Sequence, residues 1–142
     1  MRLADLIPVL QIAIGPVILI SGVGLLLLSM TNRLGRTIDR SRLLIEAKTR
    51  GSNQIHERHD EQLSILWRRA QLLRIAITLA GLSALLAAVL IIVLFVGALL
   101  KLEIAIAVVT IFISCLTAVI ASLIVFIRDI DLSLRALALE LK

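Results

Sequence analysis

The residues with the clearest capacity for chemistry are two histidines in the middle of the chain. His56 and His59 are three residues apart, so a helix places both imidazoles on one face, with Asp60 beside them. Two imidazoles at this spacing can hold a metal ion, but no spacing in the chain supplies a third strong ligand, and the H-E-x-x-H pattern is absent. The alternative is a contact within a helical hairpin or a solvated surface. We expect no metal or other cofactor.

No other pattern typical of an enzyme is present in the sequence. It contains no nucleophile motif, no glycine-rich phosphate loop and no paired catalytic carboxylates. The single cysteine, Cys115, lies in an apolar run and has no partner for an intramolecular disulfide, so we interpret it as a small apolar residue packed in lipid. The chain is therefore predicted not to be an enzyme.

Three long segments contain no Asp, Glu, Lys, Arg or His: residues 6–31, 75–100 and 104–127. Each exceeds the ~20 residues that a helix needs to cross the ~30 Å hydrocarbon core of a bilayer. Of the 142 residues, 60% are hydrophobic, which is more than so short a chain can bury in its own core. The predicted fold is all-α, with three transmembrane helices in a single membrane domain over residues 1–142.

Positive charge is concentrated between the first two apolar runs. Residues 32–74 carry ten basic and five acidic residues, and this difference of five accounts for the whole formal net charge of +5. Because Lys and Arg near the ends of spans stay on the cytoplasmic side, we expect a cytoplasmic connection, an outside N-terminus and a cytoplasmic C-terminal tail at 128–142.

The basic connection is itself predicted to be helical. It contains no proline, and its one strong break is at Gly51, Ser52 and Asn53, residue types that end one helix and begin the next. Apolar residues recur every three or four positions in its second arm, through Leu63, Leu66 and beyond. We therefore expect residues 32–74 to form a helical hairpin that extends the first two spans, and we favour a helix over an alternating strand for the tail.

The basic cluster of the hairpin has two ordinary roles. It sets the topology, and it faces anionic lipid, to which each Arg near the surface contributes ~1 kcal/mol. Its members next to the first span are Arg33, Arg36, Arg40 and Arg42. The only aromatic residue of the connection, Trp67, is expected at the membrane interface or in hairpin packing, and nucleic acid is not an expected partner.

Small residues form a stripe on the first span. Pro8, Gly15, Gly22 and Ser29 are each seven residues apart, with Ser21 nearby, and such stripes let helices approach closely in lipid. The stripe either packs within the chain or lines a subunit contact or pore. Further small or hydroxyl residues share a face on each of the other spans, for structural packing or a water-facing surface: Gly81, Ala84 and Ala88, and Thr110, Ser114 and Thr117.

The spans contain no ionisable group at membrane depth, which argues against an ion-coupled transporter. The leading hypothesis is a homo-oligomeric membrane protein that conducts ions, with the first span near the pore axis through Gly15, Ser21, Gly22 and Ser29. The alternative is a membrane scaffold or lipid-sensing protein whose basic hairpin recruits a cytoplasmic protein partner.

Several segments resemble one family of small bacterial membrane proteins, the domain of unknown function 2721. These segments are Gly15-Pro16-Val17, Ser21 to Leu26, Thr31 to Arg36, Asp39 to Arg42 and Asp129 to Leu137. The resemblance implies a bacterial inner membrane protein. It implies no activity, and it assigns no role to any residue.

Overall fold

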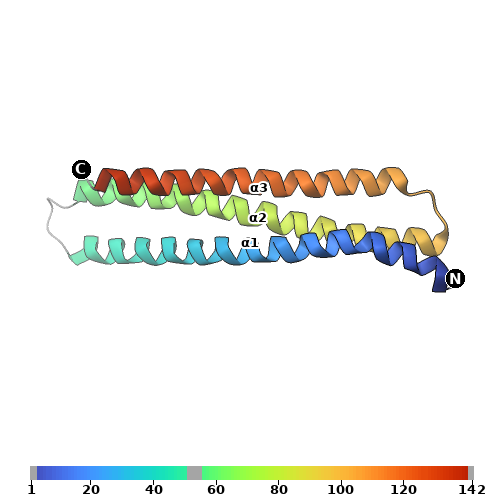
Figure 1. The fold of residues 1–142 in the computed structure, drawn as a ribbon. Coiled ribbons are helices and arrows are strands. Elements are labelled where there is room, and N and C mark those ends of the chain that lie inside the picture. The colour runs from blue at the N-terminus through green and yellow to red at the C-terminus, as the bar shows by residue number, and fades with distance from the viewer. Residues whose placement is uncertain (1–2, 51–55, 141–142) are drawn as a thin grey trace. The chain divides into compact units, whose positions relative to one another are not determined.

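The computed structural model describes the backbone of residues 3–50 and 56–140, and the side chains of residues 6–46 and 63–134. Three helices follow one another along the chain: α1 (Leu3–Arg50), α2 (His56–Leu100) and α3 (Ala105–Glu140) (Figure 1). Each is long and apolar enough to cross a membrane. The predicted all-α fold with three membrane-spanning helices is confirmed at this level.

Each helix continues beyond its apolar run without interruption. α1 extends past Thr31 to Arg50, α2 begins at His56, well before Ile75, and α3 runs on to Glu140. Because both prolines lie near the start of α1, every later segment retains its full set of backbone donors. The tail is helical through Glu140, as favoured from its composition, and the expected break at Gly51 to Asn53 lies outside the described residues.

Buried residues recur every seven positions on all three helices. This spacing is the 3.5-residue period of helices that pack along their length by interlocking side chains. The buried positions include Pro16, Val23, Met30 and Thr37 on α1; Leu66, Leu73, Ala80 and Ala87, with Ala76, Ser83, Leu90 and Gly97, on α2; and Cys115, Ser122 and Asp129, with Ala118, on α3.

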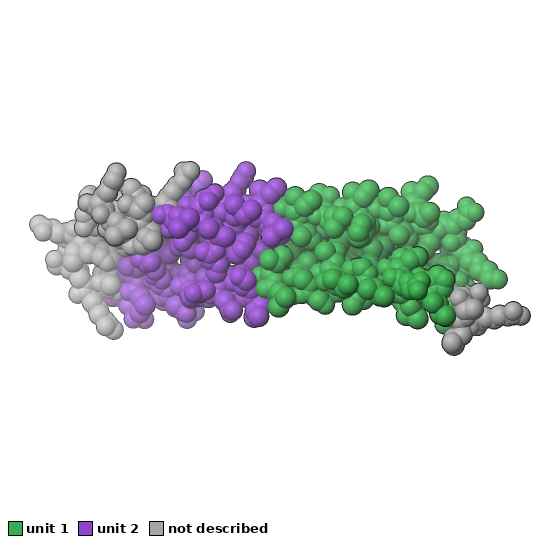
Figure 2. All heavy atoms as spheres, in the orientation of Figure 1, with its two compact units in different colours: residues 1–27, 78–121 green, residues 28–77, 122–142 purple. Residues whose placement is uncertain are grey.

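The chain divides into two compact units, each containing part of every helix (Figure 2). Unit 1 comprises residues 1–27 and 78–121, and unit 2 comprises residues 28–77 and 122–142. The boundary positions fall within a few residues of the ends of the apolar runs. Unit 1 therefore holds most of the membrane-spanning sequence, while unit 2 holds most of the charged residues.

A tight turn in unit 1 joins α2 to α3. The Leu102 N–H donates to the Gly97 carbonyl over 3.1 Å, and Lys101 adopts a left-handed backbone with φ of 53°, the geometry of a Schellman helix end. A Cβ at Gly97 would overlap the side chain of Ile104, so a larger residue here would require that side chain to shift from the end of α2. The turn thus sets the direction in which the chain passes from the end of α2 to the start of α3.

Candidate functional site

Three side-chain contacts join α2 to α3, and they recur at seven-residue steps. Ser83 meets Cys115, Ala76 meets Ser122, and Arg69 meets Asp129. Each step of seven residues back along α2 matches a step of seven forward along α3, as antiparallel packing requires. The first contact joins a hydroxyl to a thiol, the second joins a hydroxyl to a backbone carbonyl, and the third joins two opposite charges.

The contact in unit 1 is reciprocal. The Cys115 thiol donates to the Ser83 carbonyl at 3.2 Å, and the Ser83 Oγ lies 3.3 Å from the Cys115 Sγ. Both side chains are fully buried, with 0% of their surface exposed. The expectation that Cys115 packs in lipid is therefore wrong, because its thiol is enclosed by the protein on the α2-facing side of α3.

The two contacts in unit 2 are more polar. The Ser122 hydroxyl donates to the Ala76 carbonyl at 2.7 Å, a geometry that leaves no donor unsatisfied on the serine. Seven residues further along α3, the Asp129 carboxylate is completely buried and accepts from the Arg69 Nε–H at 3.3 Å. The Arg69 side chain is only 14% exposed, so this ion pair is shielded from solvent.

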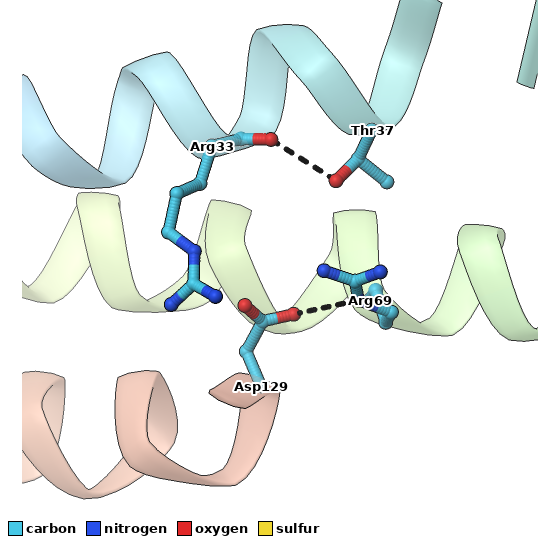
Figure 3. A network of polar contacts seen from close by, with 4 residues as sticks. All are labelled: Arg33, Thr37, Arg69 and Asp129. Atoms are coloured by element: carbon cyan, nitrogen blue, oxygen red, sulfur yellow. Dashed lines mark hydrogen bonds and ion pairs between the residues drawn. The ribbon is translucent and has the colours of Figure 1, made fainter. Parts of the chain in front are cut away.

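The first helix adds a second arginine to this group. The Arg33 side chain extends from α1 toward the Asp129 carboxylate (Figure 3). Its guanidinium carbon lies 5.4 Å from the centre of the Phe126 ring, within cation–π range. Thr37, one turn further along α1, is buried and donates to the Arg33 carbonyl at 3.0 Å. We name Arg33, Thr37, Arg69 and Asp129 the three-helix polar cluster.

The cluster is electrostatic in character. Asp129 Oδ1 is bound by Arg69, but Oδ2 is buried without a hydrogen-bond partner, which leaves one acceptor open on a charged group. Two arginines and one carboxylate give the group a formal excess of one positive charge. A buried pair of this kind favours one alignment of the helices, because any slip of seven residues would strand a charge in an apolar contact.

A metal centre finds no support in the part of the chain whose side chains the structure describes. Within that part, no three His, Cys, Asp or Glu residues lie close enough together to hold an ion. His56 and His59 belong to α2 by their backbone, but their side chains lie outside the described residues. The metal alternative for these two histidines is therefore neither supported nor contradicted.

The predicted stripe on α1 faces outward in the single chain. Gly15, Ser21, Gly22 and Ser29 are all exposed. A Cβ added at Gly15 or Gly22 would meet no atom within 4 Å. The residues of α1 that pack within the chain each lie one position further on, at Pro16, Val23 and Met30.

The other predicted residues are also placed by the structure. Arg33 is half-buried in the cluster, whereas Arg36, Arg40 and Arg42 are exposed. On α3 each exposed hydroxyl donates over 2.8 Å to the carbonyl four residues earlier, which satisfies its donor within its own helix. These hydroxyls belong to Thr110, Ser114 and Thr117.

Reasoning from the sequence missed the Arg69–Asp129 pair. A usable signal was present, because Asp129 continues the line of Cys115 and Ser122 at seven-residue spacing. The residues of this line can be recognised as buried only once the residues of α2 that they contact are known.

Three long apolar helices with a shielded ion pair at the end of the apolar runs define a multi-pass membrane protein. A protein-family model described as a protein of unknown function (DUF2721) matches residues 13–139, so the chain belongs to this family, as its sequence resemblance indicated. No curated protein and no solved structure matches the chain.

Proposed function

We propose that this protein is a non-enzymatic homo-oligomer of the bacterial inner membrane, with its N-terminus outside and its C-terminus in the cytoplasm. Its subunits associate along the outer face of α1. The observation that carries this proposal is the exposure of Gly15, Gly22 and Ser29, a line of small residues left uncovered by the chain's own packing.

The physical reason is the nature of lipid as a solvent. Lipid tails are as apolar as leucine, so helices in a membrane associate through close packing and not through the hydrophobic effect. A line of small residues offers a shallow face on which a second helix gains many van der Waals contacts. If the same small residues faced lipid, their small size would give no such gain in packing contacts.

Within such an assembly, we assign ion conduction to the axis lined by α1. Ser21 and Ser29 supply hydroxyl oxygens on or near the exposed stripe, and the spans carry no charge that would trap an ion. Pores of this kind, with few polar groups, are gated by the wetting and drying of apolar constrictions.

The subunit contact is tested with two glycines that flank the buried Val23. Gly22→Leu adds a side chain on the stripe, whereas Gly24→Leu adds the same side chain off the stripe, and both positions open onto free space in the single chain. We expect native mass spectrometry in detergent to show a smaller assembly for Gly22→Leu only. Equal masses for both variants and the parent would contradict the proposed contact.

Conduction is tested by reconstituting the purified protein in liposomes and recording ion flux across voltage, membrane tension and salt. A current that Gly22→Leu abolishes and Gly24→Leu preserves is the expected result. If the oligomer is intact but no current is seen under any condition, the proposal of ion conduction is wrong, while the proposal of subunit association still stands.

One observation favours a second function, that of a membrane scaffold. α1 continues from Asn32 to Arg50, roughly 30 Å of helix, and exposes Arg36, Arg40 and Arg42 along it. Such an arm suits the capture of an acidic cytoplasmic protein. A partner recovered by crosslinking in cells with the full-length protein should be lost when the three arginines become Glu; an unchanged partner would count against this function.

A further inference from the structure

The two oxygens of the Asp129 carboxylate have different surroundings. The side chain is completely buried, and Oδ1 accepts from the Arg69 Nε–H at 3.3 Å. Oδ2 is equally enclosed, but it makes no hydrogen bond to any group in the part of the chain that the structure describes. A charged acceptor that is withdrawn from water without a donor is unfavourable, so we expect a second donor within reach of this oxygen.

Arg33 on α1 is the donor that faces this oxygen. Its side chain extends toward the carboxylate, and the oxygen that is not joined to Arg69 lies on the side turned toward the Arg33 guanidinium (Figure 3). In the structure the guanidinium carbon instead lies 5.4 Å from the centre of the Phe126 ring. Phe126 and Asp129 are three residues apart on α3, so they are neighbours on one face of that helix. One arginine therefore has an aromatic face and a carboxylate oxygen in adjacent places.

Neither place satisfies every group. A guanidinium over the Phe126 ring gains a cation–π contact but leaves Oδ2 without a donor. A guanidinium on Oδ2 forms a charge-assisted hydrogen bond but leaves the ring. Because Oδ1 already binds Arg69, a second arginine gains less from the carboxylate than the first, and this brings the two places closer in free energy. Exchange between them needs only rotation about the side-chain bonds of Arg33.

We propose that Arg33 is a two-position latch between α1 and the other two helices. In the position that the structure shows, it holds α1 to α3 through the Phe126 ring. In the second position it donates to Asp129 Oδ2, so that one carboxylate joins all three helices. Return to the ring releases α1 from the carboxylate while the pair with Arg69 stays intact. Arg33 lies two residues beyond Thr31, so the latch acts where α1 leaves its apolar run.

The latch operates within one chain and depends neither on subunit association nor on conduction. A double-mutant cycle on the full-length protein in detergent tests it. Arg33→Gln and Asp129→Asn, singly and together, give the coupling between the two side chains from the equilibrium constant for unfolding in SDS. The unpaired Arg69 is present in both proteins that carry Asp129→Asn, so its cost cancels.

The Phe126 ring should weaken this coupling, because it competes for the same guanidinium. We expect a coupling of about twofold in the parent, rising to about tenfold when Phe126→Leu is added to all four proteins. Phe112→Leu, which removes an exposed ring elsewhere on α3, is the matched control and should leave the coupling at its parent value. Equal coupling with and without Phe126→Leu would contradict an exchange between two positions. Coupling absent from both cycles would mean that Arg33 never reaches the carboxylate.

Fluorine NMR keeps the proposal testable if a variant at Asp129 does not fold. The chain contains three phenylalanines, so 4-fluorophenylalanine gives few signals, and the signal of Phe126 is the one lost in Phe126→Leu. Arg33→Gln gives the chemical shift of this ring without its cation, and Arg36→Gln, at an exposed position, should leave the shift unchanged. The separation between the parent and Arg33→Gln should vary with temperature as the two positions exchange. A zero or constant separation would overturn the latch.

Discussion

The two units of this chain have interiors of different kinds. The buried positions of unit 1 are mostly small: Ala80, Ala87, Ala118, Ser83 and Cys115. The largest fully buried side chains lie in unit 2 and are those of Met30, Leu73 and Asp129. The same three helices, with the same seven-residue spacing, therefore pack mainly through small residues in unit 1, whereas unit 2 also buries large and charged side chains.

The difference follows from the solvent that each unit faces. In lipid there is no hydrophobic gain from burying a large side chain, so stability comes from close approach and interhelical hydrogen bonds. Beyond the apolar runs, polar surroundings make burial of Leu73 favourable by ~1.5–3 kcal/mol. In the same region, a few neighbouring residues on each side are enough to shield the Arg69–Asp129 ion pair from solvent. Substitutions that exchange these properties test the comparison.

The largest effect is expected from the ion pair of unit 2. Asp129→Ala leaves the Arg69 guanidinium shielded and unpaired, and loss of one partner of a buried pair costs about 4 kcal/mol. The free energy of unfolding is measured in detergent by titration with SDS, followed by far-UV circular dichroism. Asp131→Ala is the matched control, because it removes the same charge from an exposed position two residues away and should cost less than ~0.5 kcal/mol.

A double variant sharpens this test. Arg69→Leu combined with Asp129→Leu removes both charges, and we expect it to recover most of the stability lost in Asp129→Ala, since apolar replacements of buried pairs are often neutral. Equal losses for Asp129→Ala and Asp131→Ala would show that the cluster contributes nothing beyond a surface charge.

A smaller effect is expected from two matched leucines. Leu73→Ala in unit 2 should cost about 3 kcal/mol, because it removes both hydrophobic burial and packing contacts. Leu90→Ala in unit 1, where the side chain is 2% exposed, should cost about half as much, because lipid solvates the released surface. The same SDS titration measures both. A Leu90→Ala loss as large as that of Leu73→Ala would mean that lipid does not surround unit 1.

The smallest effect is expected from the hydroxyl of unit 1. Ser83→Ala removes the Oγ contact with Cys115 but retains the Ser83 carbonyl that accepts from the thiol, so the loss should be about 0.6 kcal/mol. Ser114→Ala, whose hydroxyl bonds only to its own helix, should be close to neutral. If Ser83→Ala cost several kcal/mol, hydrogen bonding and not close packing would dominate unit 1.

Prediction from the sequence succeeded where the signal is local. The three apolar runs, the helical tail and the family follow from the order of residues along one helix. The faces were harder to assign. The small stripe through Gly22 was recognised, but the buried line passes through Val23, and on α2 it passes through Ala80, Ser83 and Ala87 rather than their neighbours at Gly81, Ala84 and Ala88.

The sequence by itself determined that this is a protein of three membrane-spanning helices, because length and hydropathy are properties of each segment alone. Only the tertiary structure decided which face of each helix is covered and that Asp129 meets Arg69. Inside an apolar run every face is hydrophobic, so composition does not distinguish the side that contacts protein from the side that contacts lipid. That choice is made by how well neighbouring helices fit one another.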